Sequence, residues 1–182
     1  MATIIETTRL ILRTWNNEDA EAYYSINTDP KVIELLLGPL TTNQVNDFIL
    51  AANKHQEKHS YTLWALELKE TGELLGFTGL NYTEWPAHFT PAVEVGWRLG
   101  SQYWGKGYAT EAARASLEYG FKKCGLKEIV SFTVPANIRS INVMKKIGFK
   151  HDISGDFAHP KLPIDHRLSK HILYRLTANQ YL

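Results

Sequence analysis

The sequence predicts an α/β (α+β) fold, in which a mixed, mostly antiparallel sheet of about seven strands is flanked by about four helices. In the first half of the chain, apolar and polar residues alternate in stretches joined by tight turns, as in antiparallel strands. In the second half, strand-like and helix-like segments alternate, which is typical of crossover connections. No low-complexity tract, fixed-period repeat or linker interrupts the sequence, so we expect residues 1–182 to form a single domain.

The first half contains clear signals for strands and helix starts. Leu10 and Leu12 are expected on one face and Arg9, Ile11 and Arg13 on the other, as on a strand with one well-buried face. Thr41, with Gln44 three residues later, fits a capping box, and apolar residues at helical spacing follow. The elements expected here are a strand over Thr8–Trp15, a helix from Ala20 that Asp29 and Pro30 end, a helix from Thr42 to about His55, and strands over Tyr61–Leu68 and Glu73–Tyr82.

Prolines, glycines and a capping residue mark the elements of the second half. Thr83–Pro91 is expected to be a loop, Asn137 is the expected N-cap of a helix, and Gly125 and Gly148 follow helices. The expected elements are strands over Ala92–Leu99, Lys127–Val134, Phe149–Phe157 and Lys170–Leu176, with helices over Thr110–Lys123 and Asn137–Ile147. The predicted order is strand–helix–helix–strand–strand–strand–helix–strand–helix–strand–strand.

The composition excludes several classes of protein. A hydrophobic content of 44% with a net charge of +1 argues against disorder, and 20 Lys and Arg against 19 Asp and Glu give no excess charge for nucleic acid or an anionic membrane. Cys124 is the single cysteine, and the aliphatic run Leu35–Leu37 is too short to span a membrane. No secretory signal pattern or metal-ligand spacing is visible, so we expect a cytoplasmic protein without a metal.

Residues 94–112 carry the strongest functional signal, because a strand runs through a loop with Gly105 and Gly107 directly into a helix. Glycines let a ligand approach the backbone closely, and the first amides of a helix bind phosphate or pyrophosphate. The P-loop pattern holds from Gly100 to Lys106, but Gly107 replaces the hydroxyl residue that binds magnesium. The dinucleotide fingerprint G-x-G-x-x-G needs a third glycine where Thr110 stands. Taken alone, the motif could also be a tight turn that binds no ligand.

Three segments together resemble the GNAT superfamily of N-acetyltransferases. Gln102-x-x-Gly105-x-Gly107-x-Ala109 is similar to the acyl-CoA pyrophosphate loop of that family. Residues 133–140, TVPANIRS, with KIGF at residues 146–149, resemble its second signature. Residues 8–15, TRLILRTW, are similar to the start of the branch that contains ribosomal-protein N-terminal acetyltransferases of the RimJ/RimL type. The resemblance extends from about residue 7 to residue 176 and includes the order of the elements.

The resemblance implies a GNAT fold that binds acetyl-CoA. In the family, loop amides hold the pyrophosphate, and the preceding strand lines the pantetheine arm and supplies an amide that polarises the thioester carbonyl. Asn137 is implied to contact the cofactor from the following helix. The other residues implied to bind it are Trp97, Arg98, Leu99, Gln102, Gly105, Lys106, Gly107, Tyr108, Ala109 and Thr110.

Acetyl transfer to an amine benefits from a base, because only the neutral amine attacks. Glu94 is the candidate base, since it lies on an apolar strand where an ionised carboxylate is costly; a solvated edge position is the alternative. The resemblance implies that Ser140 donates to the departing sulfur, with Tyr174 as the alternative donor. Ser140 could equally be an ordinary residue of a helix start, and Tyr174 an ordinary core aromatic.

The sequence therefore predicts an acetyl-CoA-dependent N-acetyltransferase that acts by direct transfer in a ternary complex. A catalytically degenerate CoA-binding sensor and an ATP-dependent phosphotransferase with an incomplete P-loop are the alternatives. The acceptor, a protein N-terminus or a small-molecule amine, is left open, as is the choice between monomer and homodimer. Nucleic acid and membrane are not expected partners. Whether Glu94 acts directly or through water is also open.

Overall fold

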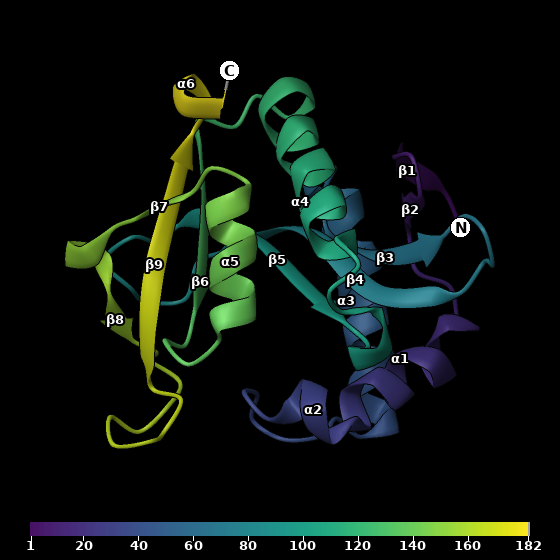
Figure 1. Cartoon of the computed structure of the whole chain (residues 1–182), viewed down its shortest axis with the longest axis horizontal. Coiled ribbons are helices and arrows are strands. Elements are labelled where there is room, and N and C mark those ends of the chain that lie inside the picture. The colour runs from purple at the N-terminus through teal and green to yellow at the C-terminus, as the bar shows by residue number, and fades with distance from the viewer. Residues whose placement is uncertain (182) are drawn as a thin grey trace.

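The computed structural model describes residues 1–181, whose nine strands form a mixed sheet (Figure 1). The strands lie in the order β1-β2-β3-β4-β5-β6-β9-β7, and β8 pairs with β9. Within the described residues, β5 and β6 are parallel and every other pair is antiparallel. The strands are β1 Thr3–Glu6, β2 Leu10–Arg13, β3 Leu63–Leu68, β4 Leu74–Thr83, β5 Ala92–Leu99, β6 Glu128–Thr133, β7 Lys150–His151, β8 Phe157–Ala158 and β9 Lys170–Thr177.

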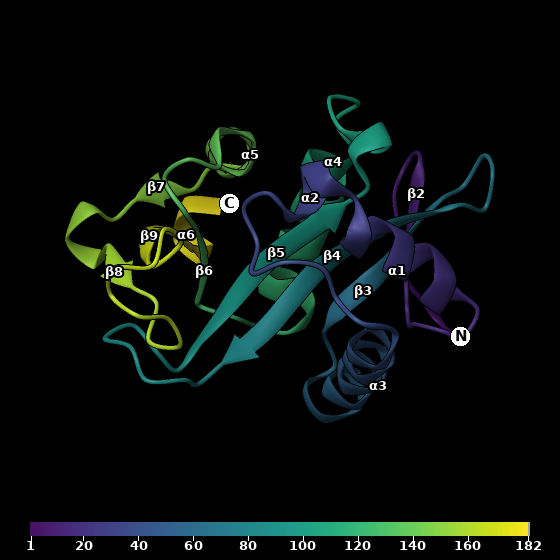
Figure 2. The ribbon, with the colours of Figure 1, turned by 90° about the horizontal axis from the view of Figure 1, so that it is seen from below.

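Helices cover both faces of the sheet, with α1 and α3 on one face and α4 and α5 on the other (Figure 2). The α-helices of the described residues are α1 Asp19–Thr28, α2 Pro30–Ile33, α3 Thr42–His59, α4 Tyr108–Glu118, α5 Ile138–Lys146 and α6 Ala178–Tyr181. In the same part of the chain, no helix combines the length and the apolar character that a membrane span needs.

Neighbouring residues of β3 belong to two different cores. Leu66 packs in the same cluster as Ala112 and Leu117 of α4, and all three side chains are fully buried. Ala65 packs on the opposite face with Tyr23 of α1 and Ile49 of α3. Burying an aliphatic side chain of this size contributes roughly 1.5–3 kcal/mol, so the alternation along the strands holds both helical layers on the sheet.

Both predicted N-caps are confirmed. Thr41 Oγ1 accepts a hydrogen bond of 3.3 Å from Gln44 N, and Gln44 Oε1 accepts one of 2.8 Å from Thr41 N. Asn137 Oδ1 accepts a hydrogen bond of 3.2 Å from Ser140 N at the start of α5. These bonds satisfy backbone amides that have no partner inside the helix, which explains where α3 and α5 begin.

The predicted strand over Phe149–Phe157 is wrong, because the chain turns away within it. The two short strands β7 and β8 are separated by a 3-10 turn over Ile153–Gly155. Asp152 Oδ1 accepts a hydrogen bond of 3.1 Å from Gly155 N and holds that turn. The Asp152 side chain therefore supports a local turn in place of continued pairing with β9.

Other differences concern the ends of elements and short additions. The short strand β1 and the short helices α2 and α6 were not predicted and raise the strand and helix counts. Helix α3 ends at His59, because Ser60 adopts a left-handed conformation there with φ of 63°. Helix α4 begins at Tyr108, before the predicted Thr110, and its continuation over Tyr119–Lys123 is π-helical.

Strands β5 and β6 diverge soon after they meet. The two strands share one register pair, Glu94 with Val130, although β5 continues to Leu99. The ribbons of β5 and β6 separate in Figures 1 and 2. One residue further along, Ser131 Oγ donates a hydrogen bond of 3.0 Å to the Val95 carbonyl. Beyond this point β5 leads to α4 and β6 leads to α5, so the divergence places the N-terminal ends of those helices on its two sides.

Candidate functional site

The loop between β5 and α4 presents backbone amides that have no cap. Gly105 and Gly107 have φ values of 76° and 83°, which side-chain-bearing residues rarely adopt. Gly107 is the N-cap of α4, so no side chain of the cap satisfies the first amides of the helix, those of Tyr108, Ala109 and Thr110. These amides lie at the positive end of the helix dipole and can receive an anionic group.

The side chains of the loop leave this backbone accessible. Gln102 is exposed and lies in a 3-10 turn, with its amide group close to Gly100. Lys106 is also exposed, and its ammonium lies 5.9 Å from the centre of the Tyr103 ring. A β-carbon built on Gly105 would meet no atom within 4 Å, so the space beside this residue is open to a ligand.

Trp97 and Arg98, both predicted to bind the cofactor, point to opposite faces of β5. Trp97 packs against the core that α4 and α5 cover. Arg98 donates through Nη1 to Asn27 Oδ1 of α1 and lies 5.6 Å from the centre of the Phe77 ring. Leu99 is buried, and its carbonyl accepts a hydrogen bond of 2.9 Å from Trp104 Nε1. The structure thus groups Trp97 and Leu99 and directs the Arg98 side chain to α1.

Glu94 lies at the point where β5 and β6 meet, on the face of β5 opposite Trp97. It is half-buried, and its Oε1 accepts a hydrogen bond of 3.0 Å from Asn81 Nδ2 of the neighbouring strand. Burial raises the pKa of Glu94 to about 7, although hydrogen bonds with Asn81 and Thr83 favour the ionised form. A carboxyl group with such a pKa can accept and release a proton near neutral pH.

Ser140 lies in the first turn of α5 and contacts β5. Its Oγ accepts a hydrogen bond of 3.2 Å from Trp97 Nε1, which brings two predicted site residues together. The Asn137 side chain caps the helix through Oδ1, and its Nδ2 donates to Thr133 Oγ1 over 3.1 Å. Both ends of the Asn137 amide are therefore bonded within the protein, and the Ser140 hydroxyl hydrogen stays available for a further acceptor.

Tyr174, the alternative donor, is buried on β9, on the far side of β6 from β5. Its ring stacks on His151 with 5.0 Å between ring centres. Burial raises the pKa of Tyr174, and the nearby Asp156 raises it further, so the hydroxyl is a poorer proton donor than an ordinary tyrosine. Ser140 contacts β5 directly through Trp97, whereas β6 lies between Tyr174 and β5.

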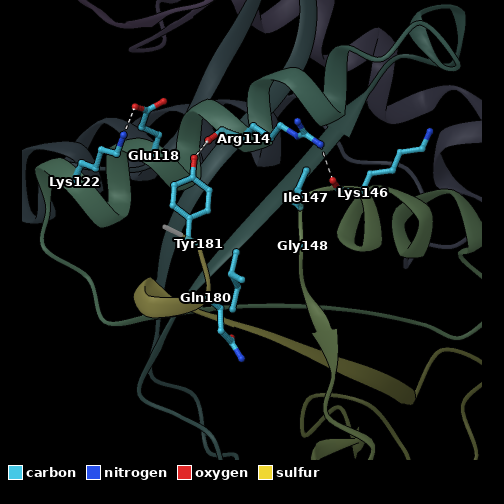
Figure 3. A pocket seen from close by; sticks show the side chains of 9 residues that line it. Arg114, Glu118, Lys122, Lys146, Ile147, Gly148, Gln180 and Tyr181 are labelled. Atoms are coloured by element: carbon cyan, nitrogen blue, oxygen red, sulfur yellow. Dashed lines mark hydrogen bonds and ion pairs between the residues drawn. The ribbon is translucent and has the colours of Figure 1, made fainter.

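A surface pocket of about 600 Å³ lies elsewhere, between α4, the end of α5 and the C-terminal helix (Figure 3). Three of its charged side chains, those of Arg114, Glu118 and Lys122, are engaged within the protein. Arg114 donates to the Lys146 carbonyl over 2.7 Å, and Lys122 pairs with Glu118 at 2.9 Å. None of the predicted site residues lines this pocket, so the candidate site remains at the divergence of β5 and β6.

Sequence reasoning missed one group of residues at the loop. Thr7 and Arg9 both bond to Glu111 in the first turn of α4. The opening stretch had signalled a family resemblance, but nothing in the sequence connects it with a residue about a hundred positions later. Over residues 1–181, no cluster of three or more His, Cys, Asp or Glu side chains has the arrangement of a metal site.

Comparison with known proteins identifies the family. The family described as an acetyltransferase (GNAT) domain matches residues 9–150. Uncharacterized N-acetyltransferase YnaD of Bacillus subtilis (strain 168) is 32% identical over 148 residues, which cover 81% of this chain and 83% of that protein.

Solved structures show the same fold. The acetyltransferase (GNAT family) from Bacillus anthracis superposes with a TM-score of 0.78 and 27% identity, over 96% of this chain and 98% of that one. Mycobacterium smegmatis RimJ in complex with CoA-disulfide has a TM-score of 0.73 and 21% identity, over 93% of this chain and 82% of that one. The predicted GNAT fold and the predicted resemblance are therefore confirmed, and the chain belongs to the GNAT superfamily of acetyltransferases.

Proposed function

We propose that this protein transfers the acetyl group of acetyl-CoA to a primary amine by direct attack in a ternary complex. The observation that carries the proposal is the position of Glu94, a carboxyl group with a pKa of about 7 beside the point where β5 and β6 diverge. The uncapped start of α4 follows at the other end of β5. The proposed proton acceptor therefore lies on β5, and the proposed anion-binding loop directly follows the same strand.

The loop fits the diphosphate group of an acyl-CoA. Its two glycines hold left-handed conformations, and the first amides of α4 have no cap from Gly107. The amides of Lys106, Gly107 and Tyr108 are the ones we assign to the pyrophosphate, together with those of Ala109 and Thr110. Gln102 lies exposed at the edge of this loop and is assigned to the same ligand.

The backbone of β5 supplies the expected polarising amide. Because the Val95 carbonyl points toward β6, the backbone groups of Trp97, two residues later, point the same way. At Trp97 the two strands no longer pair, so its N–H is free of the ladder with β6. We assign this amide to the thioester carbonyl, where negative charge develops during attack.

Acetyl-CoA supplies an electrophilic thioester carbonyl when it is bound. Glu94 accepts the proton that the amine loses as its nitrogen forms a bond to the acetyl carbon, directly or through one water. Ser140 donates a hydrogen bond to the sulfur, which leaves as the CoA thiolate when the carbon–sulfur bond breaks. Glu94 and Trp97 lie on opposite faces of β5, so the proton acceptor and the donor held by Trp97 approach the divergence from two sides.

The proposal is tested by incubating the protein with acetyl-CoA and a panel of amines that includes amino acids, polyamines and short peptides with free N-termini. We expect acetyl-CoA-dependent thiol release with at least one amine, and an acetylated product by mass spectrometry. Glu94→Gln should lower the activity by roughly 100-fold. Glu84→Gln, which changes an exposed carboxylate on the adjacent loop, should leave it unchanged. Binding of CoA without thiol release from any amine would contradict the proposal and favour the sensor.

A further inference from the structure

Arg9 joins the N-terminal part of the chain to the start of α4. Its Nε donates to Glu111 Oε2 over 2.7 Å, and its Nη2 lies 2.6 Å from the same oxygen. The backbone N–H of Arg9 and the Thr7 hydroxyl donate to Glu111 Oε1 over 3.0 Å and 2.6 Å. Both oxygens of Glu111 are thus held by the segment that precedes β2, although more than a hundred residues separate Thr7 from Glu111.

The same guanidinium also contacts Lys106 and Tyr108 of the glycine loop and lies beside Gly107 between them. Arg9 Nη1 donates to the Lys106 carbonyl over 3.0 Å. Its Cζ lies 4.6 Å from the centre of the Tyr108 ring, within the range of a cation–π contact. A β-carbon on Gly107 would stand 3.4 Å from Arg9 Nη2. Arg9 therefore links the loop, through Lys106 and Tyr108, to Glu111 on the helix.

We propose that Arg9 is a positioning residue that holds the loop over residues 105–108 in the conformation that binds acetyl-CoA, with Glu111 as its anchor. This inference rests on the proposed function, because the loop is the part of the molecule assigned to the cofactor. Arg9 acts through the Lys106 carbonyl and the Tyr108 ring.

The loop needs such a support because its own sequence is permissive. Gly105 and Gly107 can adopt many conformations, and no atom lies near the position of a β-carbon on Gly105. Ordering a flexible loop lowers affinity, so a loop that is already held binds its ligand more tightly. The planar fork of an arginine can bond a carboxylate and a carbonyl in fixed directions, which a lysine ammonium cannot do.

Arg9 also neutralises Glu111, so a purely electrostatic role must be separated from a positioning role. Without Arg9, the Glu111 carboxylate would stand uncompensated in the first turn of α4, near the amides assigned to the pyrophosphate. In the double variant Arg9→Ala with Glu111→Gln, this charge is absent and so is the bridge to Lys106. If Arg9→Ala weakens acetyl-CoA binding through the uncompensated charge, the double variant should recover the affinity. If it weakens binding through loss of loop order, the double variant should stay weak.

The experiment measures the dissociation constant of acetyl-CoA by titration calorimetry and the amide hydrogen exchange of residues 105–110 without ligand. We expect Arg9→Ala to weaken acetyl-CoA binding about tenfold or more and to speed exchange in the loop, with kcat at saturation within about twofold of wild type. The double variant should remain as weak, and Arg9→Lys should fall between Arg9→Ala and wild type. Urea midpoints confirm that each variant is folded.

Arg175→Ala is the matched control, because Arg175 also holds two carboxylates, those of Asp152 and Glu128, but does so on β9 away from the loop. It should keep wild-type affinity and loop exchange. Wild-type affinity and exchange in Arg9→Ala, or affinity restored in the double variant, would overturn the inference. If wild-type protein did not bind acetyl-CoA, the proposed function would fail, while the exchange data would still show whether Arg9 orders the loop.

Discussion

The indole Nε1 of Trp97 donates a hydrogen bond of 3.2 Å to the hydroxyl oxygen of Ser140, and this bond joins β5 to the first turn of α5. Because Ser140 Oγ accepts from the indole, its own hydrogen is directed elsewhere. The backbone N–H of Ser140 is bonded to Asn137, which fixes the start of the helix that carries the hydroxyl. The pair therefore holds an oriented hydroxyl donor beside the divergence of β5 and β6.

We predict that Ser140→Ala lowers kcat by about tenfold or more, because the departing sulfur loses its hydrogen-bond donor. The KM for acetyl-CoA should change by less than about threefold, since the pyrophosphate loop is untouched. Trp97→Phe, which removes only the indole N–H, should lower kcat less than Ser140→Ala. Steady-state kinetics over both substrates measure these values. A rise in KM with unchanged kcat would assign Ser140 to binding and remove it from the chemical step.

The pH dependence of the rate tests Glu94. With the pKa of Glu94 raised by burial to about 7, the wild-type kcat/KM should rise with pH through that value as the carboxyl group loses its proton. Glu94→Gln should lower kcat/KM by roughly 100-fold and abolish this rise. The pH–rate profile of both proteins is the measurement, and an unaltered profile in the variant would show that another group is the base.

The same carboxyl group should make folding depend on pH. Burial raises the pKa of Glu94 from 4.5 to about 7, so the folded state favours the protonated form. The stability that this shift contributes is fully present below pH 4.5 and is lost as the pH rises through 7. Relative to wild type, Glu94→Gln should therefore gain stability between pH 5 and pH 8 in urea unfolding. If the unfolding free energies of the variant and the wild type differed by the same amount at pH 5 and at pH 8, folding would not raise the pKa of this carboxyl group.

His55 should make the stability of the fold depend on pH in the opposite direction to Glu94. Its Nδ1 lies 2.8 Å from the Tyr61 carbonyl, and its Nε2 accepts from Tyr82 N over 3.1 Å, so the ring is neutral. Burial lowers the pKa of His55 below 6.5, so the stability it contributes is present above pH 6.5 and is lost as the pH falls through the folded-state pKa.

We predict that His55→Ala costs about 1–2 kcal/mol in urea unfolding at pH 8 and less at pH 5.5, because acid already weakens these bonds in the wild type. The exposed His88, replaced by Ala, serves as the control and should leave the unfolding free energy unchanged at both values. A larger cost of His55→Ala at pH 5.5 than at pH 8 would contradict the neutral, doubly bonded ring.

Local chemistry explains which parts of the fold the sequence predicts well. The capping box of Thr41 and Gln44 and the cap at Asn137 depend on residues three apart, so the pattern alone locates those helix starts. The strand expected over Phe149–Phe157 failed because the Asp152 side chain supports a turn, and a side-chain bond of this kind competes with pairing that depends on β9.

Some features of the candidate site could be predicted from local sequence, and others could not. The glycine loop and Glu94 were visible in the sequence, because glycines before a helix and a carboxylate in an apolar strand are local departures from an ordinary pattern. The contact of Trp97 with Ser140 and the bond of Arg9 to Glu111 were not, since each joins residues brought together only by packing. Sequence reasoning also placed Arg98 with Trp97, although strand alternation sends the two side chains to opposite faces.

The most direct test of the central claim is thermal unfolding with acetyl-CoA and, separately, with Mg-ATP. A ligand at a hundred times its dissociation constant adds about 2.7 kcal/mol, which for a chain of this size is on the order of 5–10 °C in the midpoint. We predict a shift of that size with acetyl-CoA and none with Mg-ATP. A shift with Mg-ATP alone would make the glycine loop a nucleotide site and contradict the proposed acetyl transfer.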